Sequence, residues 1–371
     1  MSGPEEYDVV VAGGGPAGAT TARCLARAGH RVLLADSADT AAFKIGEGLP
    51  PAARALLRDL GLWEQFVDED HLPCYGNVSA WGSPHQRCTD FVFDPNGHGW
   101  HLDRPRFDRF LRAAAGADGA DVREKAVIRH PVRGDDNVWR LELRSGQDRA
   151  QVECQWLVDA TGRHCAIARG QGAHRRVRDA LISLHARFRA TSDVPGKDRD
   201  ARTLIEAVPD GWWYTALIPS GHRVVTYLTD ADLLHPASHT PAGFLTLLDA
   251  THHIRACLAK YEYVLESDPR GAPARSSWLD PPVGDRWLAI GDAALSCDPL
   301  SSQGILTALY TGMVAGQALH TRLTGDTGAL ARYQIHLSTI GTMYQHNRIK
   351  FYQLERRWPH HPFWRRRMES W

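Results

Sequence analysis

The sequence predicts an α/β fold in which a parallel sheet and an antiparallel sheet are interleaved along the chain. Near the N-terminus, an apolar run at 7–12, a helical segment at 16–28 and a second apolar run at 31–35 follow one another. This order is typical of a βαβ unit, which builds parallel sheet. From about 178 to 280 the chain is instead rich in strand patterns, as in SLHARFRA, GWWYTALIP and HRVVTYLTD. A long amphipathic stretch at 305–323 predicts a helix that covers the parallel sheet.

The other elements are predicted in chain order. A helix is expected over Pro51–Leu60, then short strands over about 77–102 that include DFVFDP, with a turn at 94–97. Further elements are expected as a helix over Arg106–Ala115, strands at Trp139–Arg144, Gln155–Asp159 and Trp287–Gly291, one helix over about Pro241–Lys260, and a helical tail beyond 330.

These elements predict two interlocked domains, because 371 residues exceed the usual size of one domain. The nucleotide-binding domain is expected to comprise 1–76, 103–177 and 281–330, the substrate-binding β-domain 77–102 and 178–280, and the helical tail 331–371.

Composition excludes several classes of function. The 43 basic and 43 acidic residues give a formal net charge of zero, which argues against a nucleic-acid binder. The longest apolar runs are roughly ten residues, too short to span a bilayer. The N-terminus carries glutamates where a signal peptide would carry positive charge, so we expect it to enter the fold directly. The seven cysteines form no CxxC pair and no histidines have ligand spacing, so a reduced cytoplasmic protein without a metal site is expected.

A glycine-rich segment between the first strand and the first helix predicts a dinucleotide site. Residues 13–18 read GGGPAG and match GxGxxG, with Pro16 and Ala17 opening the helix. Gly13 permits the tight turn, Gly15 lets the backbone approach a pyrophosphate, and Gly18 permits close packing of helix and strand. The helix N-terminus supplies free N–H groups and partial positive charge to the phosphates.

Asp36 ends the second strand, roughly 20 residues after the last glycine, where its carboxylate can accept hydrogen bonds from an adenosine ribose. A glycine-rich turn without a ligand is the alternative explanation of the motif. Neither the glycines nor Asp36 distinguish FAD from NAD.

The segment Leu288–Ala294, which reads LAIGDAA, favours FAD. Here the chain resembles the glutathione-reductase-type FAD proteins, and more narrowly the FAD-dependent monooxygenases, flavin-dependent halogenases and related hydroxylases. The resemblance implies a Rossmann-like FAD-binding domain with an inserted antiparallel substrate domain, as in p-hydroxybenzoate hydroxylase. It also implies that Gly291 and Asp292 contact the ribityl chain and pyrophosphate.

Three further segments agree with this resemblance, in the family's order. Val158–Gly162 looks like the second strand and turn beside the nucleotide, which assigns Thr161 and Gly162 to the cofactor site. Leu102–Asp108 looks like a helix start whose arginine, Arg104, lies near the cofactor. Lys44–Pro51 resembles the G-E-x-x-x-P segment of the halogenases, which passes close to the flavin and includes Lys44 and Glu47.

Asp298–Gly304, which reads DPLSSQG, follows and opens the long helix. By the resemblance, it places helix N-terminal amides at the flavin ring, where reduced flavin carries negative charge. Ser301 or Ser302 can instead serve only as helix caps. At Gly304 a side chain would push the backbone off the ring. The cofactor residues expected here are Pro299, Ser302, Gln303 and Gly304. The sequence of this segment most resembles hydroxylases that include those of quinone-cofactor maturation.

The resemblance implies an FAD-dependent monooxygenase that hydroxylates an aromatic substrate through a flavin C4a-hydroperoxide. The electrons would come from NAD(P)H, directly or through a flavin reductase. The alternatives are a flavin-dependent halogenase, a reductase or dehydrogenase of a natural-product pathway, and a flavin-binding protein without turnover. Halogenases need a lysine that conveys hypohalous acid, and no lysine lies between Pro51 and Lys125. Their W-x-W-x-I-P motif is also broken in 211–219, and Lys44 is expected in a surface loop.

The substrate side is predicted from aromatic and histidine residues. Trp212, Trp213 and Tyr214 are candidates for the pocket wall, although strand alternation requires neighbours to face opposite ways, so some of them fill the core. His98 and His101 are candidate acids or bases, against the simpler explanation of satisfied core histidines. Tyr214, His101 and Trp213 are the residues assigned to catalysis.

The tail at 345–367 combines aromatic side chains with arginines. It predicts either a terminal helix packed on the FAD domain or a docking surface for a carrier protein or peptide that presents a tethered substrate. A free small-molecule substrate is the other possibility.

Overall fold

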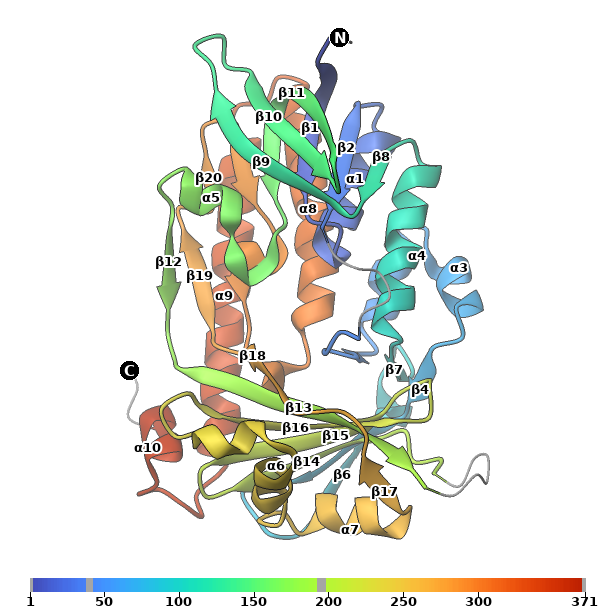
Figure 1. Cartoon of the computed structure of the whole chain (residues 1–371), viewed down its shortest axis with the longest axis vertical. Helices are drawn as coiled ribbons and strands as arrows, with labels where there is room; N and C mark the ends of the chain where they lie inside the picture. The colour runs from blue at the N-terminus through green and yellow to red at the C-terminus, as the bar shows by residue number, and fades with distance from the viewer. Residues whose placement is uncertain (1–2, 38–42, 192–197, 369–371) are drawn as a thin grey trace.

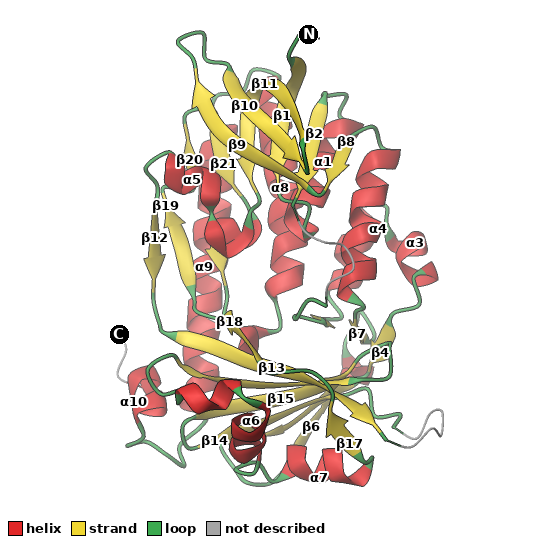
Figure 2. Cartoon of the chain, viewed as in Figure 1, coloured by secondary structure: helices red, strands yellow, loops and turns green. Residues whose placement is uncertain are grey.

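Two sheets stand at opposite ends of the molecule, with long helices between them (Figure 1). The computed structural model describes residues 3–37, 43–191 and 198–368. The parallel sheet lies near the N-terminus and the antiparallel sheet lies near the C-terminal helix, as the secondary-structure colours of Figure 2 also show. The predicted α/β fold with two interleaved sheets is confirmed.

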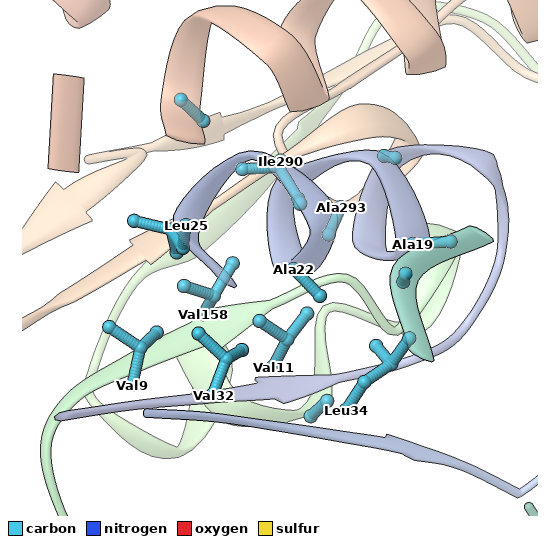
Figure 3. Packing of buried hydrophobic residues seen from close by; sticks show 14 of the residues in the cluster. Val9, Val11, Ala19, Ala22, Leu25, Val32, Leu34, Val158, Ile290 and Ala293 are labelled. Atoms are coloured by element: carbon cyan, nitrogen blue, oxygen red, sulfur yellow. The ribbon is translucent and has the colours of Figure 1, made fainter. Parts of the chain in front are cut away.

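The βαβ unit is present as β1 (Glu5–Ala12), α1 (Pro16–Arg27) and β2 (Val32–Asp36), and the two strands pair in parallel. Valines, leucines and alanines of these elements form the core, and Figure 3 shows how closely they pack. The residues labelled there are Val9, Val11, Ala19, Ala22, Leu25, Val32, Leu34, Val158, Ile290 and Ala293. Helix α8 (Gly304–Leu323) packs so closely on α1 that a Cβ on Gly312 would lie only 2.5 Å from the Ala17 carbonyl oxygen.

The parallel sheet has the strand order β20-β21-β11-β1-β2-β8, and β9 and β10 extend it as an antiparallel meander. The strands are β8 (Asp121–Glu124), β9 (Ala126–Arg133), β10 (Trp139–Ser145), β11 (Asp148–Asp159), β20 (Val283–Gly284) and β21 (Trp287–Ala289). Because β1, β11 and β21 run parallel, their carboxyl ends meet at one edge, where ligands of such sheets bind.

The antiparallel sheet has the order β17-β13-β16-β15-β14-β5-β6, with β18 paired to β13. Its strands are β5 (Gly76–Ala80), β6 (Arg87–Asp90), β13 (Leu181–Ala190), β14 (Thr203–Val208), β15 (Gly211–Leu217), β16 (Arg223–Asp230), β17 (Tyr263–Leu265) and β18 (Arg270–Pro273). Helices α6 (Pro241–Leu248) and α7 (His253–Lys260) cover the outer face. The inner face is directed toward α8 and the parallel sheet (Figure 1).

The prediction of one helix over 241–260 is wrong, because the chain breaks between α6 and α7. The buried carboxylate of Glu206 accepts hydrogen bonds from the amides of His252, His253 and Ile254, at 2.6, 3.0 and 3.0 Å. Glu206 therefore satisfies the N-terminal donors of α7, and a continuous helix would have no such free donors.

Two short sheets depart from the predicted division. The strand β7 (Gly99–His101) pairs with β3 (Gly48–Leu49) and β4 (Leu72–Cys74), and not with the antiparallel sheet to which 77–102 was assigned. The strands β12 (His174–Val177), β19 (Ser277–Asp280) and β22 (Leu295–Ser296) form another three-stranded sheet between the large ones. Residues Phe91–Phe93, expected as strand, form a turn of 3₁₀-helix that the Asp90 side chain caps.

Two helices of the N-terminal half, α2 (Ala53–Asp59) and α4 (Arg104–Ala117), lie where helices were predicted. Two further helices, α3 (Trp63–Asp68) and α5 (Ala166–Gly170), were not predicted. Helix α4 begins two residues earlier than predicted, because Asp103 accepts the Arg106 amide at 3.0 Å and caps it.

The tail forms α9 (Ala329–Gln353), which contacts both large sheets, and α10 (Pro362–Met368), which packs on the antiparallel sheet. Helix α9 packs against α8, and its Tyr333 hydroxyl donates to the Ala289 carbonyl at 2.8 Å. Helix α10 packs on the antiparallel sheet, where the indole of the buried Trp364 donates to the Val208 carbonyl at 2.9 Å. The expectation that the end of the tail packs on the FAD domain is therefore wrong for α10.

Candidate functional site

A cavity of about 950 Å³ lies between the two large sheets. Its wall runs from the glycine-rich loop after β1, past the N-terminus of α8, to the inner face of β14, β15 and β16. Of the predicted cofactor residues, the following line it: Gly13, Gly15, Pro16, Ala17, Gly18, Asp36, Lys44, Glu47, Arg104, Thr161, Gly162, Asp292, Pro299, Ser302 and Gly304. The structure thus brings together segments that lie almost 300 residues apart in the chain.

The glycine-rich loop has the close contacts that its motif predicts. Gly13 has φ of +110°, and a Cβ there would lie 2.2 Å from the Ala160 carbonyl oxygen. A Cβ on Gly18 would lie 1.8 Å from the Gly13 carbonyl oxygen. At Gly15, in contrast, a Cβ would meet nothing within 4 Å. Gly13 and Gly18 are therefore required by packing, whereas Gly15 keeps space open toward the cavity.

Asp36 is held by an arginine that sequence reasoning missed. The guanidinium of Arg112, on α4, lies 3.2 Å from the Asp36 carboxylate and donates to the Gly14 carbonyl at 3.3 Å. It also binds Glu124 at 2.8 Å. Arg112 lies two helical turns after Arg104, so the helical period places the two side chains near the same face. The spacing of Arg104 and Arg112 was the feature of the sequence from which Arg112 could have been predicted to lie at the site.

The second nucleotide-side turn is fixed by Asp159. Its carboxylate accepts the Thr161 amide at 3.0 Å and the Ala168 amide at 2.9 Å, so it shapes the turn and caps α5. The loop after β21 is joined to this turn by Arg163, whose guanidinium lies 3.2 Å from the Asp292 carboxylate. Gly291 does not line the cavity; its φ is +53°, and a Cβ would lie 2.7 Å from the Ala17 side chain. Close packing against Ala17 explains why residue 291 is a glycine.

The loop Asp298–Gly304 lies at the N-terminus of α8 and lines the cavity. Neither serine caps this helix, because the capping position is Gln303 and no side chain accepts an N-terminal amide there. Ser301 instead closes the preceding turn by accepting the Gln303 amide at 3.2 Å, and Ser302 adopts φ of +50°. A Cβ on Gly304 would meet nothing within 4 Å, while Gln303 is not among the lining residues.

Lys44 and Arg104 share one carboxylate at the side of the cavity. The Lys44 ammonium lies 2.7 Å from Asp108, and the Arg104 guanidinium lies 3.2 Å from the same side chain. Arg104 also donates to the Gly46 carbonyl at 2.8 Å, which ties α4 to the 44–49 segment. These two cations lower the pKa of Asp108 although its burial opposes them. Lys44 is half-exposed, as expected, but it is ion-paired.

Tyr214 and Glu47 face each other in the part of the cavity nearest the antiparallel sheet. Both line the cavity, and Glu47 is 5% exposed. Burial raises the pKa of the Glu47 carboxyl, although its hydrogen bonds with backbone and Tyr214 oppose the shift. Burial and the neighbouring Glu47 raise the pKa of Tyr214 well above its ordinary value. The buried Glu47 and the half-buried Tyr214 form a polar pair at the cavity wall that can hold or accept a proton.

Strand alternation separates the predicted aromatic residues. Trp212 and Tyr214 lie on the inner face of β15 and line the cavity. Trp213 points to the outer face, where it stacks on Tyr227 at 4.7 Å between ring centroids and packs against Phe244 of α6. Trp213 therefore lies in the core and does not reach the cavity.

The family model whose description is "FAD binding domain" matches residues 6–342, most of the chain. The chain belongs to this family of FAD-dependent oxidoreductases. It is 32% identical over 369 residues to LodB of Marinomonas mediterranea, which is named an FAD-dependent oxidoreductase, and the match covers 98% of this chain and 97% of LodB.

Solved structures of other flavoenzymes share the fold. The myxobacterial chondrochloren halogenase CndH superposes with a TM-score of 0.88 at 24% identity, over 98% of this chain and 86% of CndH. QhpG, described as a peptidyl tryptophan dihydroxylase essential for tryptophylquinone cofactor biogenesis, superposes with a TM-score of 0.77 at 26% identity, over 98% of this chain and 80% of QhpG. Further curated relatives at 24 to 26% identity are named as halogenases or as halogenating enzymes of carrier-bound pyrrole.

The cavity of this flavoenzyme fits FAD. Gly15 and Gly304 leave open space where a side chain would fill it. The uncapped amides at the N-terminus of α8 are free to bind an electron-rich group, and Asp36 is placed to accept the ribose hydroxyls at the other end. In the described ranges, no helix is long and apolar enough to cross a membrane. Those residues also contain no cluster of three or more potential metal ligands.

His101 does not reach the flavoenzyme's cavity. It is 1% exposed, and its ring nitrogens contact the Leu217 carbonyl at 2.8 Å and the Thr203 hydroxyl at 2.9 Å. Burial lowers the pKa of His101 to about 4, so the ring is neutral near pH 7. His98 packs its ring against Trp100 at 4.8 Å. The satisfied core histidine, the simpler of the two explanations, describes His101.

Acid is expected to destabilise the protein through three buried histidines. Burial lowers the pKa of His71, His101 and His185 from 6.5 to about 4. In the unfolded chain each binds a proton as the pH falls below about 6.5, whereas in the folded chain each stays neutral until about 4. Their contribution is therefore complete above pH 6.5 and is lost as the pH falls toward 4, at about 3 kcal/mol each.

The measurement is urea unfolding between pH 7.5 and pH 4.5 for the protein and for His185→Asn. Glu47 and Asp298, whose pKa values burial raises, act in the opposite direction, so the difference between the two proteins isolates one histidine. The variant should lose less unfolding free energy on acidification. Parallel pH profiles would contradict the prediction.

Proposed function

We propose that this flavoenzyme is a monooxygenase that hydroxylates an aromatic substrate, either free or held by a carrier protein or peptide. The observation that carries the proposal is the composition of the cavity wall opposite the loop Asp298–Gly304. There, the inner face of the antiparallel sheet contributes Trp212, Tyr214, Ile205 and Leu228. Aromatic and aliphatic walls bind a planar ring, while a few polar groups orient it.

The pair of Glu47 and Tyr214 supplies those polar groups. A buried carboxyl with a raised pKa can accept a hydrogen bond from a ring N–H or O–H and take up the proton. Tyr214 lines the same cavity as that carboxyl and completes the wall of the pocket. Tyr214 and Glu47 are accordingly the residues that we assign to substrate orientation, in place of His101 and Trp213.

Bound FAD would supply the redox chemistry, with electrons from a reductant and activation of O2. In the overall reaction a hydroxyl group that carries one oxygen atom of O2 takes the place of a ring hydrogen, and the other oxygen atom leaves as water, with consumption of one NAD(P)H and one proton. NAD(P)H, directly or through a flavin reductase, supplies the electron pair. The protein's residues bind the ring, exclude water from the cavity and hold the proton. A cytoplasmic location is part of the proposal, since NAD(P)H is found there.

Halogenation is the second candidate, because halogenases are among the relatives and because a lysine does line the cavity. Of the lysines in the described ranges, Lys44 alone is in the wall, and its ammonium is bound to Asp108. An ammonium that is held by a carboxylate is less available to carry hypohalous acid, because its charge and one of its three N–H donors are engaged. This ion pair favours hydroxylation.

Turnover in heavy-isotope oxygen with bromide present distinguishes the two reactions. Free tryptophan, free tyrosine and the same residues in a short peptide are the substrates to test, with NADPH or NADH and with or without a flavin reductase. We expect the product to gain one heavy oxygen atom and no bromine, and Lys44→Met to retain more than half of the activity. Lys260→Met, at an exposed position on α7, is the matched control.

A bromine isotope doublet that disappears in Lys44→Met but persists in Lys260→Met would establish the halogenase instead. Oxygen uptake that no aromatic compound stimulates would contradict both.

A further inference from the structure

A buried tyrosine of the tail joins the two walls of the cavity. The hydroxyl of Tyr352, on α9, donates to the Asp298 carboxylate at 2.7 Å. The same oxygen accepts the indole N–H of Trp212 at 3.2 Å. Asp298 begins the loop at the N-terminus of α8, and Trp212 lies on the inner face of β15, so one oxygen atom connects both. All three side chains are 1% exposed.

The ring of Tyr352 is flanked by two arginines. The guanidinium of Arg367 lies over its ring at 5.1 Å and binds Asp230 of β16 at 2.8 Å. The guanidinium of Arg348 lies 5.2 Å from the same ring centroid and 3.5 Å from the Asp298 carboxylate. The tyrosine is thus fixed from both the loop side and the sheet side.

A second tyrosine of α9 fixes the backbone of the same loop. The Tyr344 hydroxyl accepts the Asp298 amide at 2.7 Å and contacts the Ser276 hydroxyl at 2.7 Å. Arg348 also donates to Asp179 at 3.0 Å, in the segment between β12 and β13. Side chains of helix α9 therefore hold both the carboxylate and the backbone amide of Asp298 in this loop.

Neither Tyr352 nor Tyr344 is among the residues that line the cavity, so neither is expected to touch the substrate. Their hydroxyls contact Asp298 and Trp212, which line the cavity, and Ser276, which lies behind the wall. Burying a polar group is costly unless it is hydrogen-bonded, and the hydroxyls of Tyr352 and Tyr344 each have two partners, which restricts them to one geometry. The Nε atoms of Arg348 and Arg367 have no such partner among the residues that the structure describes, so the restraint comes from the hydroxyls. The arrangement is therefore suited to setting the distance between the loop and the substrate wall.

We propose that Tyr352 is a positioning residue whose hydroxyl sets the separation between the flavin-side loop at Asp298 and the substrate wall at Trp212. The inference rests on the proposed monooxygenase function, because oxygen transfer requires the substrate ring at a fixed distance from the cofactor. Loss of the hydroxyl loosens that separation. More of the O2 consumed then appears as hydrogen peroxide, and less appears as hydroxylated product.

The test is Tyr352→Phe, which keeps the ring and its contacts with the arginines but removes the bridging oxygen. Tyr333→Phe is the control, because Tyr333 is also 1% exposed on α9 and its variant also loses a buried hydroxyl, whose single hydrogen bond, at 2.8 Å, goes to Ala289 of the parallel sheet. In Tyr352→Phe, we expect the product formed per O2 to fall at least threefold while the Michaelis constant changes less than twofold. In Tyr333→Phe, the product formed per O2 should stay within twofold of the unmodified protein.

A second readout does not depend on turnover. The visible absorption bands of bound FAD respond to the polarity and position of nearby groups, so they should be displaced in Tyr352→Phe and unchanged in Tyr333→Phe. If no substrate is hydroxylated by the unmodified protein, the proposed function fails, and the spectra alone decide the positioning role.

Unchanged spectra and unchanged coupling in Tyr352→Phe would overturn the inference. If Tyr352→Phe does not fold, Trp212→Phe removes the other hydrogen bond of the bridge and leaves the bond of Tyr352 to Asp298. If Trp212→Phe has the same FAD spectrum and the same product formed per O2 as the unmodified protein, the inference is overturned as well.

Discussion

Replacement of Gly15 by leucine is expected to abolish FAD binding while the fold is kept. Gly15 precedes α1 with φ of −72°, which leucine adopts without strain, and a Cβ there meets no protein atom within 4 Å. The side chain would instead enter the cavity at the place where the glycine-rich motif brings the backbone to a pyrophosphate. Affinity should fall by at least 100-fold, equivalent to about 2.8 kcal/mol.

FAD titration of the apoprotein, with circular dichroism as the check on folding, measures this effect. Gly170→Leu is the matched control, because a Cβ on Gly170 also meets nothing within 4 Å and the residue is exposed at the end of α5, outside the cavity wall. That control should bind FAD normally. A folded Gly15→Leu protein that retains FAD at one per chain would refute the assignment of the loop.

Removal of α10 by truncation after Arg357 is expected to destabilise the protein severely. Phe363 and Trp364 are 0% exposed and pack against the antiparallel sheet. Arg367 forms a buried ion pair with Asp230 at 2.8 Å, and its loss would leave that carboxylate without one of its partners. Trp364→Ala alone should cost about 3–5 kcal/mol of unfolding free energy.

Thermal unfolding and soluble yield are the measurements, with Trp278→Ala as the control, because Trp278 is 39% exposed. Trp278→Ala should change stability much less than Trp364→Ala. A truncated protein that stays soluble and keeps both FAD and thermal stability would instead support the tail as a detachable docking surface for a tethered substrate.

Arginines of the tail are paired with carboxylates of the same chain, and this pairing is why we expect the tail to stabilise the fold. Arg366 and Arg367 bind Asp230 and Asp232, and Arg357 binds Glu355. Charges that are paired within the chain leave less positive potential for an acidic partner. The sequence shows only that the arginines and aromatic residues are close along the chain, and it does not show that carboxylates from β16 reach them.

The sequence by itself determined the nucleotide-binding part of the protein. The order of strand, GxGxxG, helix and second strand ending in Asp36 predicts a local unit whose turn and helix start are set by residues of the same segment. The same holds for α8 and for the loop before it, where Pro299, Ser302 and Gly304, which were predicted to contact the cofactor, line the cavity. A dinucleotide was predicted from the glycine-rich segment, whereas FAD and the family were predicted from the resemblance carried by Leu288–Ala294 and the segments that agree with it.

The tertiary structure alone decided which side chains face the cavity. The alternation of Trp212, Trp213 and Tyr214 was readable, but the face that is turned toward the cavity is set by the packing of α6 and α7 on the opposite side. His101 is a core residue because Leu217 and Thr203, more than 100 residues away, satisfy its ring. The joining of Tyr352 to Asp298 and Trp212 likewise depends on where α9 ends against the antiparallel sheet. Such contacts depend on elements distant in sequence, and no local periodicity encodes them.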